Sequence, residues 1–464
     1  MPGIVSVPPS PPEGGRRARE VMFAGACLAV LMPSIDQTIV ATALPTITRA
    51  LHTTLAWSVW TVSVYQLGMV MATPIAGRLS DTLGRRRTFL AFVALFTASS
   101  VLCGLSANVY MLVGFRLLEA LGGGGFTPSI TGLVADHFGA DRDRRVGLVM
   151  GIVPLGALVG PAIGGVVVTY LSWRLIFFVN LPLSLVVLTV LSRVLPRSPR
   201  PRADGVPIDF LGSGLLCAAI LAFMLGVSQL GDRHPAPLPV ALSLAAAAVL
   251  VPGFSLRQKH TRFPIFPALP RRRVFALLNV LNFLYGAASI GAFSLVPLYA
   301  QVRYGISPLE AGLFLTVRAL TLAAMTSLTS MLLLDRLGYR RPIAIGYLVA
   351  VTGMLLTALP SPPGTAPIAW LTLTTALYGS GIGTAMPLNV AAFQLMPERI
   401  GALTGIRMMF RQLGAITSLS IAGAVTARNA SPATALASVF AVLGLLTLAA
   451  MPLIRSVPEP REGG

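Results

Sequence analysis

Residues 156–165 read Gly-Ala-Leu-Val-Gly-Pro-Ala-Ile-Gly-Gly and lie inside a longer apolar run. That run is long enough to cross a bilayer as an α-helix. Gly156, Gly160 and Gly164 recur every four residues, so they form a stripe on one face of the helix. Such a stripe lets another helix approach to backbone contact, and Pro161 removes one backbone donor and bends the helix beside that contact. The stretch therefore predicts a membrane helix with a close helical neighbour.

The composition also indicates a membrane protein. Of the 464 residues, 55% are hydrophobic and 11% are charged, whereas about 25% of the residues of a soluble domain are charged. We count fourteen apolar runs of spanning length. They predict an all-α, polytopic membrane protein with fourteen transmembrane helices. Their approximate limits are 21–44, 57–76, 88–105, 107–133, 146–170, 175–194, 208–229, 237–256, 274–298, 308–334, 342–360, 367–392, 403–427 and 434–454.

The basic residues are distributed unevenly over this topology. With the N-terminus placed in the cytoplasm, 26 of the 35 Lys and Arg residues fall in cytoplasmic segments and five fall in outer loops. This bias is the positive-inside pattern of membrane proteins. The formal net charge of +19 therefore reflects orientation and contact with anionic lipids, and not a nucleic-acid partner. We expect a multi-pass protein of the bacterial cytoplasmic membrane with both termini in the cytoplasm.

Two turns on the expected cytoplasmic side carry related sequences. Residues 77–87 follow the second run and residues 334–341 follow the tenth. Both place an Asp, then a Gly three residues later, then paired Arg residues, so Asp81 and Asp335 mark corresponding points of two halves. The runs are thus arranged as six, two and six. The expected units are a disordered cytoplasmic tail 1–20, an N-terminal six-helix bundle 21–195, an inserted helix pair 208–256, a C-terminal six-helix bundle 274–454 and a cytoplasmic tail 455–464.

The glycine-rich stretch resembles the fifth-helix antiporter motif of the major facilitator superfamily, G-x-x-x-G-P-x-x-G-G, which occurs mainly in exporters. The matching positions are Gly156, Gly160, Pro161, Gly164 and Gly165. The resemblance implies two six-helix halves that rock about a central site, and transport out of the cell. We expect the motif to form a tightly packed seam between the halves. A helix–helix contact with no further role is the alternative.

The loop after the second run resembles the gating motif of the same superfamily, G-x-L-a-D-r-x-G-R-r-x. The matching positions are Gly77, Asp81, Gly84, Arg85 and Arg86. The Asp carboxylate can lie at the N-terminus of a neighbouring helix or pair with an Arg of the other half, which would hold the cytoplasmic side closed. The two Gly residues permit a tight turn. An ordinary positive-inside loop is the alternative.

Two acidic residues lie well inside the predicted spans, where ionisable groups are costly and therefore candidates for function. One is Asp36, within Ile35–Pro45. This segment looks like the first-helix signature D-x-T-I-V-x-x-A-L-P of the 14-helix drug:proton antiporter branch, although Ala41 stands where many members have Asn. Asp36 is expected either to bind a proton or cation, or to accept hydrogen bonds that hold the helix in place.

The other is Glu119, which shares a face of the fourth predicted helix with Arg116. Their surroundings resemble the fourth-helix motif R-x-x-Q-G-x-G-a-a, with Glu119 in place of Gln and Ala120 in place of Gly. A Glu can titrate where a Gln cannot. An apolar site favours the protonated carboxyl and a nearby guanidinium favours the carboxylate, and this opposition makes Glu119, beside Asp36, a candidate to bind and release the proton. A permanent Arg116–Glu119 ion pair is the alternative.

Three further polar residues are candidates for the substrate cavity. Tyr65 and Gln66 lie in the second predicted span, in a stretch similar to one on that helix in family members. Arg318 lies in the tenth span, and its half has no acidic residue in mid-span. It is expected to face Asp36 or Glu119, to meet an anionic group of the substrate, or to reach the membrane interface. Neutral, zwitterionic or anionic compounds are therefore predicted to be better substrates than dications.

Motifs of other functional classes are missing from the sequence. It contains no Walker sequence and no nucleophile elbow, and its four His and three Cys residues have neither metal-ligand nor disulfide spacing. We therefore expect no enzymatic activity, no cofactor and no metal, with the proton motive force as the energy source.

The function predicted from the sequence is proton-coupled export of small amphipathic drugs or antibiotics by alternating access. The expected partners are a small-molecule substrate, protons and membrane lipids, and the protein is expected to be a monomer. A dedicated exporter of one natural product made by the host is the second possibility. A membrane sensor or scaffold that transports nothing is the third.

Overall fold

The computed structural model describes residues 14–138, 141–195, 209–230, 236–261, 272–388, 391 and 400–459. Throughout these residues the regular structure is helical, and helix coincides with each of the fourteen apolar runs. Among the described residues, nine helices are long and apolar enough to cross a membrane. The all-α, polytopic fold is therefore confirmed, while fourteen as the number of crossings stays a prediction.

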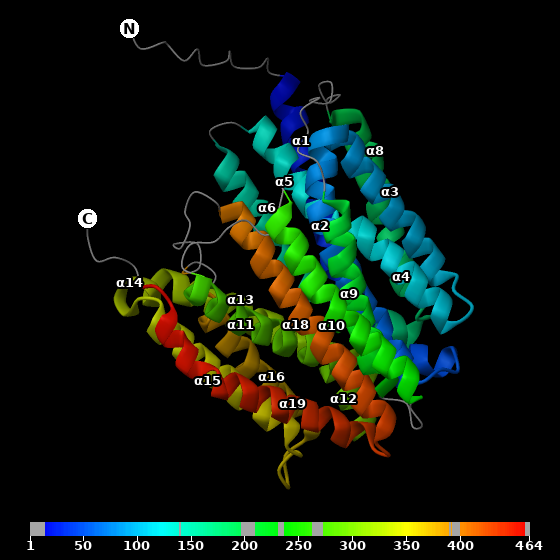
Figure 1. Cartoon of the computed structure of the whole chain (residues 1–464), viewed down its shortest axis with the longest axis vertical. Helices are drawn as coiled ribbons and strands as arrows, with labels where there is room; N and C mark the ends of the chain where they lie inside the picture. Colours follow the sequence, from blue (N-terminus) through cyan, green and yellow to red (C-terminus); the bar gives the residue numbers. More distant parts are fainter. Residues whose placement is uncertain are drawn as a thin grey trace.

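The N-terminal bundle gathers the blue-to-cyan helices of Figure 1. Side-chain caps begin two of its helices: Thr54 accepts a hydrogen bond from the amide of Trp57, and Asn108 accepts one from that of Met111. A single Gly, Gly84, with φ 90°, ends one helix and begins the next. The elements are α1 (Gly14–Ala50), α2 (Leu55–Leu83), α3 (Arg85–Gly104), α4 (Val109–Gly124), α5 (Phe126–His137), α6 (Arg142–Tyr170), α7 (Leu175–Phe178) and α8 (Asn180–Val194).

The C-terminal bundle gathers the olive-to-red helices, and the green inserted pair crosses the front of the molecule in Figure 1. The inserted pair consists of α9 (Phe210–Leu230) and α10 (Pro237–His260). The C-terminal elements are α11 (Arg272–Tyr285), the π-helix η2 (Gly286–Gly291), the 3-10 helix η3 (Ala292–Leu295), α12 (Val296–Tyr304), α13 (Pro308–Leu328), the π-helix η4 (Thr329–Leu333), α14 (Leu334–Leu337), α15 (Arg340–Ala358), α16 (Pro367–Thr384), α18 (Ile400–Arg428), α19 (Pro432–Ala449) and the 3-10 helix η6 (Met451–Ser456).

The molecule has two ends that differ in how the bundles meet. We call the end where α1 begins the termini side and the opposite end the distal side (Figure 1). Within the described part of the chain, hydrogen bonds join the bundles toward the distal side. Gln301 Nε2 donates to the carbonyl of Thr42 at 3.3 Å, and Thr316 Oγ1 donates to the carbonyl of Leu158 at 3.1 Å. The bundles are thus held together at the distal side.

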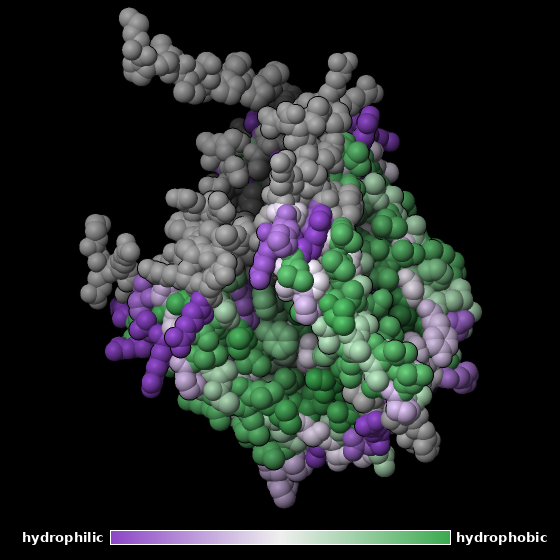
Figure 2. Space-filling view, viewed as in Figure 1, coloured by the Kyte–Doolittle hydropathy of each residue, from purple (hydrophilic) through white to green (hydrophobic). Residues whose placement is uncertain are grey.

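The perimeter of the molecule is apolar, as a lipid environment requires. Large hydrophobic side chains are exposed on helices of both bundles and of the inserted pair, for example Leu185, Val249 and Leu445. Figure 2 shows this face as a broad hydrophobic surface with hydrophilic residues at its margins. An apolar surface of this extent marks a membrane-facing protein, because soluble monomers rarely expose one.

Backbone contact between η2 and α18 depends on Gly286. A Cβ atom built there would collide with the carbonyl oxygen of Arg411 and lie 2.8 Å from its Cα. We therefore expect Gly286→Ala to force the helices apart and to destabilise the protein by about 1–3 kcal/mol, as overpacking does. Thermal unfolding in detergent should show a lower Tm.

Gly214 supplies the matched control, because a Cβ atom there would meet nothing within 4 Å. Gly214→Ala should leave Tm unchanged or raise it, since Ala stabilises a helix interior by about 0.5–1 kcal/mol relative to Gly. Equal shifts for the two variants would contradict the assigned role of Gly286.

Candidate functional site

The N-terminal bundle encloses a charged cluster around Arg116. Its Nη1 atom lies 2.6 Å from Asp36 Oδ2 and 2.8 Å from Glu119 Oε2, and its Nε donates to the carbonyl of Thr61 at 3.3 Å. The three charged side chains are at most 1% exposed. Helices α1, α2 and α4 thus meet at one guanidinium. The fold brings together Asp36, from the first span, and the Arg–Glu pair of the fourth.

Neutral polar groups complete the shell around the carboxylates. Asn180 Nδ2 donates to Asp36 Oδ1 and to Ser100 Oγ, each at 3.1 Å. The Cys103 thiol donates to Glu119 Oε2 at 3.4 Å. Asn180 and Ser100 are 1% exposed and Cys103 is fully buried. Helices α3 and α8 therefore contribute to the cluster as well.

Aromatic rings cover the guanidinium. The carbon Cζ of Arg116 lies 4.1 Å from the centroid of the Tyr65 ring and 5.7 Å from that of Phe177. A cation above an aromatic face is stabilised by the ring quadrupole, more so without competing water. Tyr65 is 1% exposed, so in this structure it encloses the charged cluster.

The cluster contains one more carboxyl group than guanidinium. With both carboxyls ionised its net charge is −1, and with one of them protonated its net charge is zero. A buried, uncompensated charge is costly in a medium of low polarity. Glu119 Oε1 has no hydrogen-bond partner within the described part of the chain, whereas both oxygens of Asp36 have one. The geometry therefore suits the binding of one proton.

Gln66, another residue predicted to line the substrate cavity, is buried beside the charged cluster's helix α1. Gln66 is 1% exposed and accepts a hydrogen bond from Gln37 Nε2 at 2.7 Å. It lies next to Tyr65 in the chain, but this side-chain hydrogen bond joins it to Gln37 of α1.

Arg318 lies apart from the cluster, in the C-terminal bundle. Its Nη1 donates to the carbonyl of Ser289 at 2.6 Å, and within the described residues its Nε has no partner and no carboxylate lies within ion-pair distance. Of the three expectations, a position facing Asp36 or Glu119 is not met in this conformation, because the side chain turns toward η2 of its own bundle. Contact with an anionic group of the substrate or with the membrane interface stays a prediction. The hydroxyl of the buried Tyr378 likewise has no hydrogen-bond partner among the described residues.

The glycine stripe of α6 packs against α1. Gly156, Gly160 and Gly164 each face a small polar residue on α1. These counterparts are also spaced by four: Ser34, Thr38 and Thr42. A Cβ atom at Gly160 would lie 2.8 Å from the carbonyl oxygen of Ile35, so the backbones are in contact. The stripe therefore joins two helices of one bundle, and the expectation of a seam between the halves is wrong for these three glycines.

The remaining motif residues do face the other bundle. A Cβ atom at Gly165 would lie 2.8 Å from Cα of Leu309 on α13. One at Gly312 of α13 would collide with the carbonyl oxygen of Pro161. Successive helical residues are about 100° apart around the axis, so Pro161 and Gly165 lie one position beyond the stripe and meet a different neighbour.

The gating-loop residues lie on the termini side. Arg85 donates to the carbonyl of Gly132 and Arg86 to that of Ser192, so both Arg side chains contact helices of their own bundle. Gly84 forms the turn, and Gly77 lies within α2. The side chain of Asp81 is outside the described residues, and its predicted partner stays a prediction.

Sequence reasoning missed Asn180, Ser100 and Cys103. Asn180 stands in the string Phe-Val-Asn-Leu-Pro and begins α8. An amide inside an apolar span is a signal in itself, because a buried polar group needs a partner. Which partner it finds depends on the packing of α8 against α1 and α3.

Comparison with known proteins places this geometry in a family. The family model described as "Major Facilitator Superfamily" matches residues 26–419. Multidrug transporter protein MdtP of Bacillus subtilis (strain 168) is 30% identical over 418 residues, which are 89% of this chain and 76% of that protein. The tetracenomycin C resistance and export protein of Streptomyces glaucescens is 30% identical over 427 residues, which are 90% of this chain and 78% of that protein.

A solved structure agrees with the fold. The xylose transporter XylE from E. coli, in a partially occluded inward open conformation, superposes with a TM-score of 0.66 at 15% identity, over 97% of this chain and 100% of that one. The helical bundles and the matches define a membrane transporter. The chain belongs to the major facilitator superfamily, and the membership predicted from its motifs is confirmed.

The two faces of α6 predict different effects of the same substitution. Gly160→Leu should separate α6 from α1 and lower Tm in detergent, because the stripe lies within one bundle. Gly165→Leu should leave Tm unchanged and weaken the contact with α13 at the distal side. Spin labels at Ala107 and Thr365, on exposed distal turns of the two bundles, should then report longer distances in Gly165→Leu. Unchanged label distances in Gly165→Leu would contradict its place at the contact between bundles.

Proposed function

We propose that this chain exports small amphipathic drugs or antibiotics across the bacterial cytoplasmic membrane in exchange for protons. The observation that carries the proposal is the enclosed cluster of Asp36, Arg116 and Glu119, in which two carboxyls share one guanidinium. Relatives named for multidrug transport and for antibiotic export support the substrate class. The termini side corresponds to the cytoplasm in this proposal, as the distribution of Lys and Arg favours.

The proton acts by changing the net charge of a buried site. With one carboxyl protonated the cluster is neutral and stable in its enclosed form. When the proton leaves, the net charge of −1 favours a rearrangement that admits water or a cationic group of a substrate. One proton moving down a potential of 100 mV supplies about 2.3 kcal/mol, and each pH unit adds about 1.36 kcal/mol. These energies suffice to bias a two-state transporter.

Helix α1 provides a route from the proton site to the contact between bundles. It carries Asp36, and it carries Thr42, whose carbonyl accepts the hydrogen bond from Gln301 of the other bundle. It also packs along α6, whose Gly165 faces α13. A shift of α1 after protonation would therefore act on both distal contacts. The structure is closed at these contacts, so a substrate would enter from the termini side.

A second candidate function is export of a single natural product made by the host. The relative named for tetracenomycin C resistance and export favours it. Breadth of resistance decides: a cell expressing this chain should resist several unrelated compounds under the first proposal and one compound class under the second. If the protein were a sensor or a scaffold, no substrate-dependent proton movement would be expected.

Proton-driven transport into inverted membrane vesicles tests the proposed cluster. Glu119→Gln cannot bind and release a proton, so we expect at least a tenfold loss of proton-driven uptake of the dye Hoechst 33342 and of substrate-induced proton release. Glu459→Gln is the matched control, because Glu459 is a partly exposed carboxylate that pairs with Arg340 in the other bundle. Asp36→Asn shows how much of the proton-driven uptake depends on the second carboxyl. Full coupling in Glu119→Gln would exclude Glu119 as the proton carrier.

Arg318 is proposed to select substrates with an anionic group. A partly buried guanidinium without a carboxylate partner is stabilised when it binds an anion. We expect Arg318→Gln to reduce transport of the anionic dye carboxyfluorescein about tenfold and that of Hoechst 33342 less than twofold. Arg303→Gln, which removes a cation near the Tyr299 and Tyr304 rings, should change neither. Equal losses for both dyes in Arg318→Gln would contradict a role in selection.

A further inference from the structure

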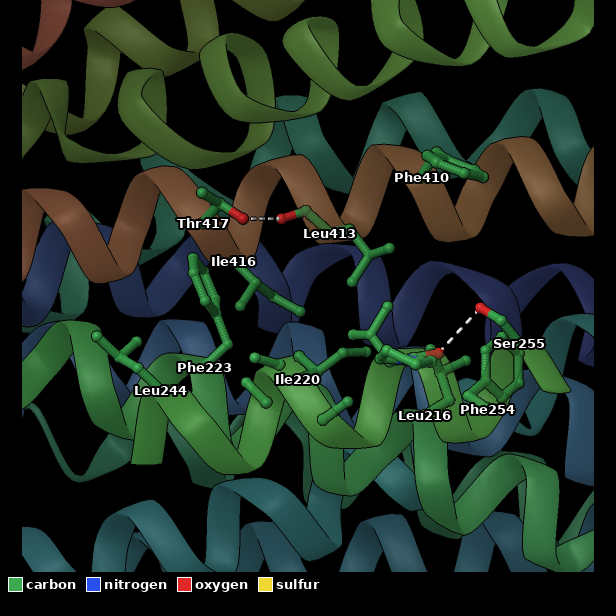
Figure 3. A pocket seen from close by; sticks show the side chains of 15 residues that line it. Leu216, Ile220, Phe223, Leu244, Phe254, Ser255, Phe410, Leu413, Ile416 and Thr417 are labelled. Carbon is green, nitrogen blue, oxygen red and sulfur yellow. Dashed lines mark hydrogen bonds between the residues drawn. The ribbon is translucent and has the colours of Figure 1, made fainter. Parts of the chain in front are cut away.

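The inserted helix pair leaves a groove beside α18. A cavity of about 710 Å³ lies between α9, α10 and α18. In Figure 3 the side chains of α18 line one side and those of the inserted pair line the other. The lining residues are Leu216, Ala219, Ile220, Phe223, Leu244, Ala247, Ala248, Val251, Pro252, Phe254, Ser255, Phe410, Leu413, Ile416 and Thr417.

The groove offers no polar group to a ligand. Its two hydroxyl groups donate to their own helices, Ser255 to the carbonyl of Val251 at 2.9 Å and Thr417 to that of Leu413 at 2.8 Å (Figure 3). All the other lining side chains are hydrocarbon. A drug with polar groups would find no recognition here, whereas an alkyl chain would fit.

The length of the groove matches one leaflet of a bilayer. Along α10 it extends from Leu244 to Ser255, a distance of about 17 Å at 1.5 Å per residue. The hydrocarbon core of a bilayer is about 30 Å thick, so one leaflet is about 15 Å deep. Seven residues of α10 precede this stretch and five follow it, so the groove lies near the middle of the helix. Its last lining residue on α10, Ser255, lies one turn before Lys259, so an acyl chain whose headgroup is at the termini-side end of α10 can reach into the groove.

Basic side chains lie one turn beyond the groove on α10. The last turn of α10 carries Arg257, Lys259 and His260. Lys259 follows Ser255 by four residues and so lies on the same helix face, one turn beyond the lining. Arg257 pairs with Asp209 at 3.2 Å, which offsets that carboxylate. Lys259 and His260 are exposed, and Figure 2 shows hydrophilic residues at this end of the inserted pair, above the apolar face.

We propose that the groove binds an anionic phospholipid of the leaflet on the termini side. An acyl chain occupies the space between α10 and α18, and the phosphate of the headgroup lies at Lys259 and His260. The apolar length and the charge at one end together match an amphiphile of this shape. Cationic residues near a membrane surface favour anionic lipids by about fivefold each. The lipid then serves as a structural part of the contact between the inserted pair and α18.

Native mass spectrometry of the full chain tests this proposal. The protein is released from nanodiscs that contain equal amounts of phosphatidylglycerol and phosphatidylethanolamine. We expect one phosphatidylglycerol molecule to remain bound preferentially. Ala248→Trp fills the groove from an exposed lining position and should reduce the bound fraction at least tenfold. Ala245→Trp, also exposed on α10 but outside the lining, should retain the lipid.

The headgroup contact has its own variant. Lys259→Gln should lower the preference for phosphatidylglycerol over phosphatidylethanolamine about fivefold, and the variant should remain folded. Equal retention in Ala248→Trp and Ala245→Trp would overturn the proposal. So would slower transport of Hoechst 33342 in Ala248→Trp with the lipid still bound, which would indicate a path for substrate. A dimer lost only in Ala248→Trp, with no lipid retained by the unaltered protein, would indicate a second copy of the chain.

Discussion

The N-terminal bundle is organised around one buried guanidinium. Arg116 contacts a carboxylate on its own helix, another on α1 and a backbone carbonyl on α2, under the ring of Tyr65. A cation enclosed in this way is stable only if every contact is present, since the loss of one partner leaves a charge uncompensated. The requirement fixes how the surrounding helices pack. It also makes the charge state of two carboxyls depend on the packing of the whole bundle.

The second constraint is backbone contact between helices. Where α6 lies on α1, glycine on one helix faces small hydroxyl residues on the other at matching intervals. This close contact joins the helix that carries Asp36 to the helix that touches the other bundle. Small residues are effective here because, within a membrane, packing and not exclusion of water holds helices together. Helix α1 therefore connects the charged cluster to the contact between the bundles. A change in the charge of the cluster can act on the distal side through this helix.

Much of this architecture could be predicted from the sequence, because its signals are local. Apolar runs give the helices, the distribution of Arg gives an orientation, and motifs such as the stretch at Gly156 identify the family. The Arg116–Glu119 contact was predictable too, since three residues separate them on one helix. Asn180, Ser100 and Cys103 were missed, and three possibilities stayed open for Arg318. In each case the answer depends on which helix lies beside which, and no local pattern contains that information.

The sequence by itself determined that this is a polytopic membrane protein of the major facilitator superfamily, with two acids and few basic residues inside its predicted spans. The spans and their few charges follow from the cost of transferring polar groups into lipid, which acts on each segment separately. Only the tertiary structure decided that Asp36 and Glu119 share one Arg and that Arg318 stands apart. It also decided that the glycine stripe serves one bundle while Gly165 serves the contact between two. These choices arise from rotation and packing of whole helices, where residues distant in the chain meet.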